Sequence, residues 1–237
     1  MSGHSKWATT KRAKAVVDAK RAVVFTRLAH GITLAAREKG GNPDINFSLR
    51  LAIEKAREAS MPKENIERAI KRGTGELSGE TLEEITYEGF GPGGVALLVE
   101  TLTNNRNRTV SEIKHILTKH GGSLGAANSV AWMFEKKGVI GVPTSTLSEE
   151  AELSLIEAGA QDIQKEGSEA TIITEVEDFQ NVKSAAEKLG TKTEFAEFDY
   201  LPKNTVALSE EGTEKLEKLL EEIEEHTDVL HHYSNRA

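Results

Sequence analysis

The stretch VIGVPTSTLSEEAELSLIEAGAQDIQKEGSEATIITEV, residues 139–176, decides the fold class. It and the residues that follow it alternate short apolar runs with amphipathic stretches, in the order strand, helix, strand, strand, helix, strand. These predicted elements are residues 139–142, 149–158, 161–166, 169–176, 178–189 and 193–200. The order is that of a ferredoxin-like β-α-β-β-α-β unit. We therefore predict an inserted ferredoxin-like α+β domain over residues 137–203.

The residues on either side of this segment predict a second α+β domain. Apolar runs over 82–90 and 95–102 flank Gly91-Pro92-Gly93-Gly94, which indicates a hairpin. After it, Thr109 and Glu112 form a T-x-x-E capping box at the start of a helix, and a strand is expected over 130–134. The capping box implies that Arg106 and Arg108 lie in the loop before that helix.

The carboxyl end of the chain completes this second domain. An acidic helix over 209–225 and a strand through Val229 and Leu230 have no partner in their own neighbourhood. They most simply complete the sheet that begins near residue 80. The predicted domain is therefore discontinuous and spans 76–136 and 204–237.

The first part of the chain predicts a helical domain. Apolar residues recur at helical spacing over 18–39, and Gly40-Gly41-Asn42-Pro43 ends that helix. Asn46 is the expected N-cap of a second helix to about Ala59. A third, shorter helix ends at Gly73. Together with a basic arm, these helices form a predicted domain over 1–75, so the fold class is α+β with three helices first and two α+β domains after them.

Composition excludes several classes of protein. The 237 residues are 38% apolar and 29% charged, a mixture typical of globular proteins. Zero cysteines exclude disulfides, thiolate metal sites and a cysteine nucleophile, and suit a cytoplasmic location. No apolar run approaches the ~18 residues of a membrane span. We expect no membrane partner.

Charge is divided unevenly along the chain. Residues 1–72 carry 16 Lys and Arg against 7 Asp and Glu, a net charge of +9, whereas residues 73–237 carry 14 against 31, a net charge of −17. Each Lys or Arg that meets a phosphate releases counterions, while an acidic body repels the same polymer and orients the encounter. The asymmetry favours a nucleic-acid partner; the alternative is a solvated basic face.

Two local patterns add candidate binding residues. Trp7 lies within the basic run, where an indole can stack on a base; it is otherwise a core anchor. Arg106 and Arg108 precede the predicted helix start, where the helix dipole disfavours cations. With the first free helix amides they would form a phosphate seat. The alternative is a polar loop whose arginines pair with nearby glutamates.

Two sequence motifs typical of enzymes occur, but neither has the strand and helix order that its function requires. Gly89 to Gly94 satisfies G-x-G-x-x-G, but a strand follows where a dinucleotide site needs a helix. Gly121 to Gly125 satisfies G-x-S-x-G, but it leaves a helix and enters a strand, the reverse of a nucleophile elbow. The seven histidines show no metal-binding spacing. We predict no catalytic residue, metal, cofactor or small-molecule substrate, and hence a protein that is not an enzyme.

Several long motifs resemble one family. SGHSKWATTKRAK, DAKRAVVFT, EKAREASMPKENIERAIKRGTG, YEGFGPGGVALLVE, TNNRNRTVSEIKHILTKHGGSLG and SVAWMFEKKGVI occur in this order within about the first 140 residues. Together they resemble the YebC/PmpR family, to which the mitochondrial translational activator of cytochrome oxidase is related. The resemblance implies one helical and two α+β domains, the third inserted into the second. It also implies a DNA-binding transcriptional regulator.

The leading hypothesis is a non-enzymatic nucleic-acid-binding regulator of gene expression. The first alternative is a translation factor that binds ribosomal RNA on the ribosome; the second is an adaptor that binds other proteins. The residues predicted to bind nucleic acid are cations of the arm, of the helical domain and of the 104–108 segment, with one tryptophan: Lys6, Trp7, Lys11, Arg12, Lys14, Lys20, Arg21, Arg27, Arg68, Lys71, Arg72, Arg106 and Arg108.

Overall fold

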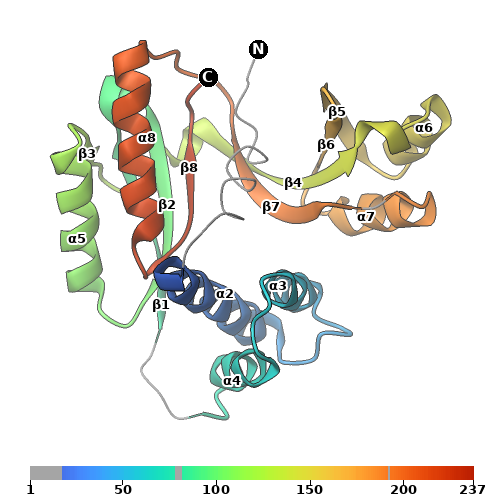
Figure 1. Cartoon of the computed structure of the whole chain (residues 1–237), viewed down its shortest axis with the longest axis horizontal. Helices are drawn as coiled ribbons and strands as arrows, with labels where there is room; N and C mark the ends of the chain where they lie inside the picture. Colours follow the sequence, from blue (N-terminus) through green and yellow to red (C-terminus); the bar gives the residue numbers. More distant parts are fainter. Residues whose placement is uncertain (1–17, 78–81, 192) are drawn as a thin grey trace. The chain divides into compact units, whose positions relative to one another are not determined.

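The computed structural model describes residues 18–77, 82–191 and 193–237 (Figure 1). The chain divides into two compact units: Met1–Met133 with Asn204–Ala237 form the first, and Phe134–Lys203 form the second. The sequence predicts three domains, two of which fall largely within the first of these units. The predicted domain boundaries therefore stay predictions. Within the described residues, no helix is long and apolar enough to cross a membrane.

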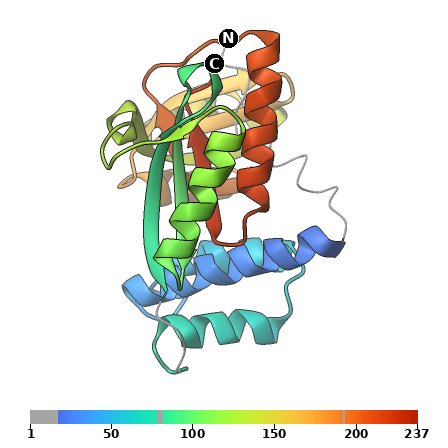
Figure 2. The same ribbon diagram turned by 90° about the vertical axis from the view of Figure 1, so that its left-hand side faces the viewer.

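Three helices form the first part of the first unit, as predicted: α2 (Asp18–Lys39), α3 (Phe47–Glu58) and α4 (Lys63–Gly73). Their apolar stripes meet in one core that includes Ile32, Leu49 and Ile66. Figure 2 shows α4 running alongside α2. Gly73 permits this close approach, because a Cβ there would lie 2.4 Å from the Thr33 carbonyl oxygen.

Asn46 fastens two of these helices together. Its side-chain oxygen accepts a hydrogen bond from the Leu49 amide at 3.0 Å, which confirms it as the N-cap of α3. Its amide nitrogen donates to the carbonyls of Ala35 at 2.8 Å and Gly40 at 2.7 Å, at the end of α2. The side chain is fully buried, so one residue caps α3 and satisfies, away from water, one carbonyl of α2 and one just after its end.

A four-stranded sheet forms the rest of the first unit. Its strands are β1 (Glu83–Phe90), β2 (Ala96–Thr103), β3 (Ser123–Leu124) and β8 (Val229–Ser234), in the order β3-β1-β2-β8. The last strand joins this sheet, as predicted, and pairs with β2. Helices α5 (Arg106–Lys119) and α8 (Glu210–Glu225) cover one face, where Leu97 and Val99 pack against Ile113 and Leu219 (Figure 2).

The glycine-rich segment between β1 and β2 is the predicted hairpin turn. Gly93 and Gly94 have φ values of +72° and +79°, a left-handed conformation that glycine adopts without strain. The Gly91 amide donates to the Val95 carbonyl at 2.7 Å and closes the turn. These glycines are explained by turn geometry.

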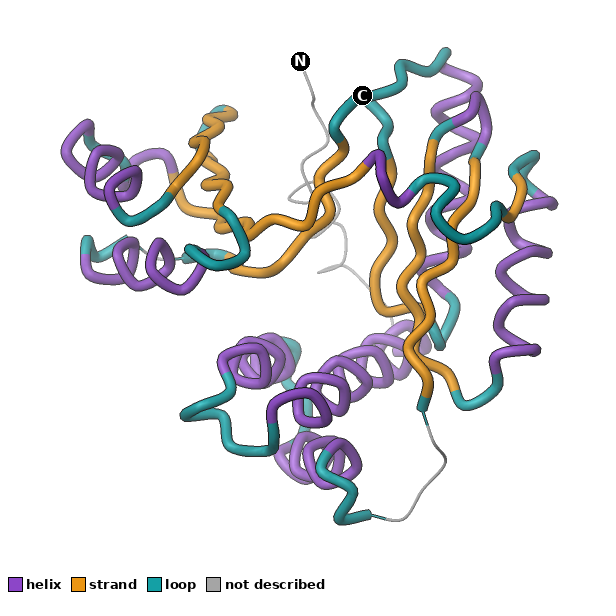
Figure 3. The backbone as a smooth tube through the Cα atoms, turned by 180° about the vertical axis from the view of Figure 1, so that it is seen from behind, coloured by secondary structure: helices purple, strands orange, loops and turns teal. Residues whose placement is uncertain are grey.

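The second unit has the predicted ferredoxin-like order. Its elements are β4 (Phe134–Pro143), α6 (Glu149–Glu157), β5 (Ala160–Glu166), β6 (Glu169–Thr174), α7 (Phe179–Lys188) and β7 (Phe195–Pro202). The strands are antiparallel in the order β5-β6-β4-β7. Figure 3 distinguishes the strands (orange) from the helices (purple). Leu155 of α6 and Phe179 of α7 are fully buried, as are Ile140 and Ile172 of the sheet. The predicted α+β class is confirmed.

The strand predicted over 130–134 is wrong except at its end. Ala131–Met133 form a 3-10 turn, and β4 begins at Phe134. The reason is a buried carboxylate: Glu88 of β1 accepts hydrogen bonds from the amides of Val130 at 2.7 Å and Ala131 at 2.8 Å. Those amides are therefore not available to a neighbouring strand.

The predicted capping box at Thr109 is also wrong. Asn105 is the N-cap of α5, and its side chain accepts a hydrogen bond from the Arg108 amide at 3.1 Å. Thr109 lies inside the helix, fully buried, and its hydroxyl donates to Asp228 Oδ2 at 2.7 Å. A tertiary partner 119 residues away therefore takes the hydroxyl that local spacing assigned to a cap.

Replacing Asn46 tests its double role. We expect Asn46→Ala to lower the free energy of unfolding by about 2 kcal/mol, because a cap is lost and two carbonyls lose their donor. The matched control is Asn42→Ala, at an exposed position where the side chain accepts the Asp44 amide. Urea unfolding curves measure both; equal midpoints for the two variants would contradict this role.

Replacing Asp228 tests the link between α5 and β8. Burial alone would raise the pKa of Asp228, but hydrogen bonds from Thr109 and Arg108 outweigh it and hold the pKa below its ordinary value. The stabilising contribution is therefore complete above about pH 4, the ordinary aspartate pKa, and is lost as the pH falls through the lower folded value. We expect Asp228→Asn to cost about 2–3 kcal/mol near pH 7 and to flatten the loss of stability in acid.

Glu217→Gln is the control for Asp228→Asn, since Glu217 is an exposed carboxylate that pairs with Arg236 at 3.2 Å. Urea unfolding at several pH values compares the three proteins. If both variants unfolded at the midpoint of the parent protein, the assigned role of Asp228 would be wrong.

Candidate nucleic-acid interface

A groove between α2 and α4 is lined by polar side chains from both helices. Its volume is about 250 Å³. Thr33 of α2 donates to the Ala69 carbonyl of α4 at 3.1 Å and holds the two helices together at its floor. The side chains that line the groove are Phe25, Thr26, Ala29, His30, Thr33, Asn65, Arg68, Ala69 and Arg72.

Two predicted cations lie in this groove. Arg68 and Arg72 are four residues apart on α4, so they occupy the same face of the helix. Both are exposed, and within the part of the chain that the structure describes neither side chain has an ion pair or hydrogen bond. Two unneutralised guanidinium groups on one face form a suitable seat for a phosphate. The end of the α4 dipole also favours cations there.

His30 faces the same groove from α2 and has an unsatisfied atom. Its Nδ1 is buried and has no hydrogen-bond partner among the described residues. The pKa of His30 is lowered, mainly by burial. The charge of Asp228 opposes this shift, and the charge of Arg72 adds to it. The imidazole is therefore neutral near pH 7, so it adds no repulsion to the two arginines and keeps one N–H to donate.

The other predicted cations are distributed differently. Lys71 is exposed on α4 but does not line the groove. Lys20 and Arg21 belong to the first turns of α2. Lys6, Trp7, Lys11, Arg12 and Lys14 lie outside the described residues.

Arg27 is engaged within the chain. Its side chain is 17% exposed and lies 3.8 Å from Glu224 of α8. Burial lowers the pKa of Arg27, although Glu224 opposes the shift. This arginine ties α2 to α8 and leaves little surface to a phosphate.

The phosphate seat predicted at Arg106 and Arg108 does not have the expected geometry. Both residues lie in the first turn of α5, after its cap. The Arg108 guanidinium lies 2.7 Å from Asp228 and 3.8 Å from Glu112, and its amide is bound to Asn105. Arg108 therefore fits the alternative given by the sequence, in which these arginines pair with acidic side chains. Arg106 is exposed, and its carbonyl accepts from the Tyr87 hydroxyl at 3.5 Å.

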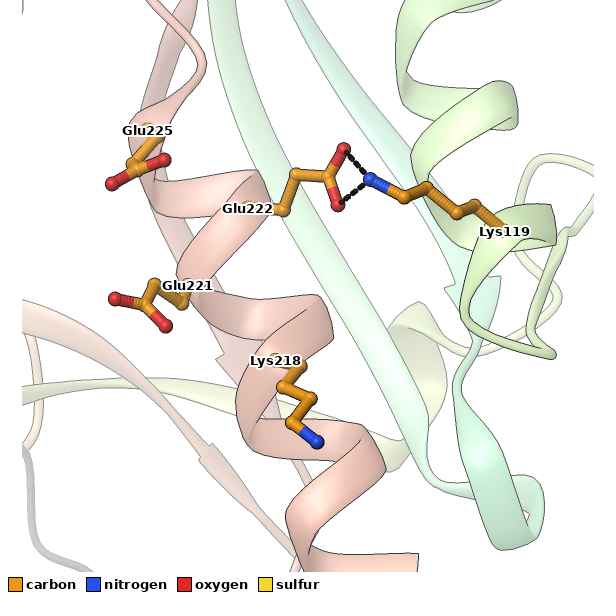
Figure 4. Close-up of a pocket in the computed structure, with 5 residues that line it drawn as sticks. All are labelled: Lys119, Lys218, Glu221, Glu222 and Glu225. Atoms are coloured by element: carbon orange, nitrogen blue, oxygen red, sulfur yellow. Dashed lines mark hydrogen bonds and ion pairs between the residues drawn. The ribbon is translucent and has the colours of Figure 1, made fainter.

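Two surfaces elsewhere have the wrong charge for a polyanion. The hollow beside α8 is lined by Lys119, Lys218, Glu221, Glu222 and Glu225, and Glu222 is paired with Lys119 at 2.8 Å (Figure 4). Glu112, His226 and Asp228 bring ligand atoms within 4.8 Å of one another, as divalent cations require. There, however, the Arg108 guanidinium already supplies the positive charge.

His30 and Asn65 were missed by the sequence analysis. A lone histidine on an amphipathic helix and an asparagine on another carry no pattern that links them. They become one site only because α4 packs against α2, which brings residues about 40 positions apart to one groove.

Comparisons with known proteins cover almost the whole chain. A model described as the TACO1/YebC protein N-terminal domain matches residues 5–76, and one described as the TACO1/YebC second and third domain matches residues 82–236. A probable transcriptional regulatory protein of Thermoanaerobacter pseudethanolicus is 54% identical over 99% of this chain and 96% of its own length. Another, from Chlorobium luteolum, is 51% identical over 99% and 95%.

A solved structure shows the same fold. The crystal structure of a conserved hypothetical protein, Aq1575, from Aquifex aeolicus superposes with a TM-score of 0.84 and is 48% identical, covering 94% of this chain and 93% of that one. The two family models together account for both units and for the helices that carry the groove. The chain therefore belongs to the TACO1/YebC family.

Proposed function

We propose that the protein is a non-enzymatic nucleic-acid-binding regulator of gene expression, in first place a DNA-binding transcriptional regulator. The observation that carries the proposal is the groove of Arg68, Arg72 and His30, within the residues 1–72 that carry a net charge of +9. Its relatives are named probable transcriptional regulatory proteins, which supports the same function.

The groove supplies anchoring to phosphate. Two guanidinium groups and a neutral imidazole can hold one or two phosphate oxygens by charge-assisted hydrogen bonds. Contacts to phosphate fix position and contribute affinity, whereas sequence is read at base edges. Lys71 on α4 and the arm cations Lys6, Lys11, Arg12 and Lys14 would extend the contact along the same backbone, with Lys20 and Arg21 at the start of α2.

Phosphate anchoring is common to DNA and RNA, so the second candidate is ribosomal RNA. Recovery of crosslinked nucleic acid from cells, followed by sequencing, separates the two. A dominance of chromosomal DNA supports transcriptional regulation, and a dominance of ribosomal RNA replaces it with a role in translation. Crosslinks to protein alone would favour the adaptor hypothesis.

The arm is tested by its effect on the salt dependence of binding. About six neutralised phosphates give a slope of log affinity against log salt near −5 on duplex DNA. We expect Lys6→Ala, Lys11→Ala and Lys14→Ala together to reduce the steepness by about 2.7, because three phosphate contacts are lost. Fluorescence anisotropy at several salt concentrations measures the slope. An unchanged slope would remove the arm from the interface.

The groove is tested in the same way. We expect Arg68→Ala with Arg72→Ala to weaken binding and to reduce the steepness of the slope by about 1.8. Lys63→Ala is the matched control, since Lys63 lies on the same helix, outside the groove, and pairs with Glu67 at 3.5 Å. Binding by the double variant equal to that of Lys63→Ala would contradict the proposed function of the groove.

A further inference from the structure

Trp132 is an exposed aromatic ring whose polar atom is already satisfied. The side chain is 62% exposed, in the 3-10 turn Ala131–Met133. Its indole Nε1 donates to the Ser129 carbonyl at 3.1 Å. Because this hydrogen bond fixes one edge of the ring, the surface offered to solvent is largely its apolar face.

The turn that carries Trp132 is held by Glu88. This carboxylate on β1 accepts from the amides of Asn128 at 2.5 Å, Val130 at 2.7 Å and Ala131 at 2.8 Å. Glu88 is only 7% exposed. Burial alone would raise the pKa of Glu88, but the backbone hydrogen bonds outweigh it and lower the pKa, so the group is ionised near pH 7.

A buried carboxylate and three backbone hydrogen bonds thus position a ring that contributes little to the core. A fixed ring loses little conformational freedom when a partner covers it, which favours binding. The arrangement is suited to a flat partner that needs one well-placed face.

The isolation of Trp132 among exposed apolar side chains favours a base over a protein. Within the described residues 82–133 and 204–237, it is the only large apolar side chain that is exposed. A protein interface covers about 800 Å² on each side, with further contacts around each anchor residue. A nucleic-acid base needs only one ring face, and stacking tolerates any base.

We propose that Trp132 is a stacking platform for an unpaired base of a nucleic acid. The inference rests on the proposed function and adds to it a preference for single-stranded segments. The groove between α2 and α4 would hold phosphate, and Trp132 would hold a base. Sequence analysis assigned stacking to Trp7 alone.

Tryptophan fluorescence tests the stacking directly. The chain has two tryptophans, so Trp7→Phe keeps an aromatic ring at position 7 and leaves Trp132 as the only indole emitter. We expect single-stranded RNA or DNA of about 12 nucleotides to quench the Trp132 emission. Inorganic polyphosphate, which carries the charge without rings, should not quench it. Equal quenching by polyphosphate, or none by the single strands, would overturn the proposal.

Affinity measurements separate stacking from phosphate contact. We expect Trp132→Ala to raise the Kd for the single strand by about 5- to 150-fold, the effect of losing one stacked base. The salt slope should stay unchanged, since no phosphate contact is lost. Trp132→Phe should stay within about threefold of the parent, because its ring still stacks. The matched control is Ile45→Ala, at an apolar side chain that is 80% exposed.

The outcomes distinguish this inference from the function on which it rests. If the parent binds and Arg68→Ala with Arg72→Ala weakens binding while Trp132→Ala does not, only the stacking is wrong. It is equally wrong if Trp132→Ala weakens duplex and single strand alike, or if Trp132→Phe is as weak as Trp132→Ala. If the parent binds neither polymer, both proposals fail. Thermal unfolding of each variant confirms that the fold is intact.

Discussion

The return of the carboxyl end to the sheet depends on Asp228. Its carboxylate binds Arg108 and Thr109 at the start of α5, 120 and 119 residues earlier in the chain, and its carbonyl accepts the Leu102 amide of β2. At the far end of β8, the Asn235 side chain accepts the Ala96 amide at 2.7 Å. Between these two points β8 pairs with β2, so α8 is held over the face that Leu97 and Val99 present.

Ion pairs within the first unit also determine which arginines are already neutralised. Arg108 neutralises Asp228 and Arg27 pairs with Glu224, so both arginines are used to hold the first unit together. Arg68 and Arg72 form no ion pair among the described residues, and both line the groove beside α2. Two arginines without an ion pair among the described residues therefore line one groove.

Buried carboxylates also differ in what they do for the structure. Glu88 and Asp228 are both buried carboxylates in the first unit, and each is satisfied by donors from a segment distant in sequence. Asp228 uses them to join helix and strand. Glu88 instead shapes the turn before β4, and in doing so it sets the position of an exposed ring.

Local sequence determined the elements of this protein. The periodicity of apolar residues set the three first helices and the ferredoxin-like order, Asn46 capped its helix, and Gly93 and Gly94 made the hairpin turn. Those features depend on residues within a few positions of each other, so the local sequence pattern predicts them. The burial of Thr109 inside α5, the turn at Ala131 and the membership of the groove were decided by tertiary structure. In each of these, the deciding partner lies about 40 to 120 residues away, and only packing brings it within hydrogen-bonding distance or into one groove.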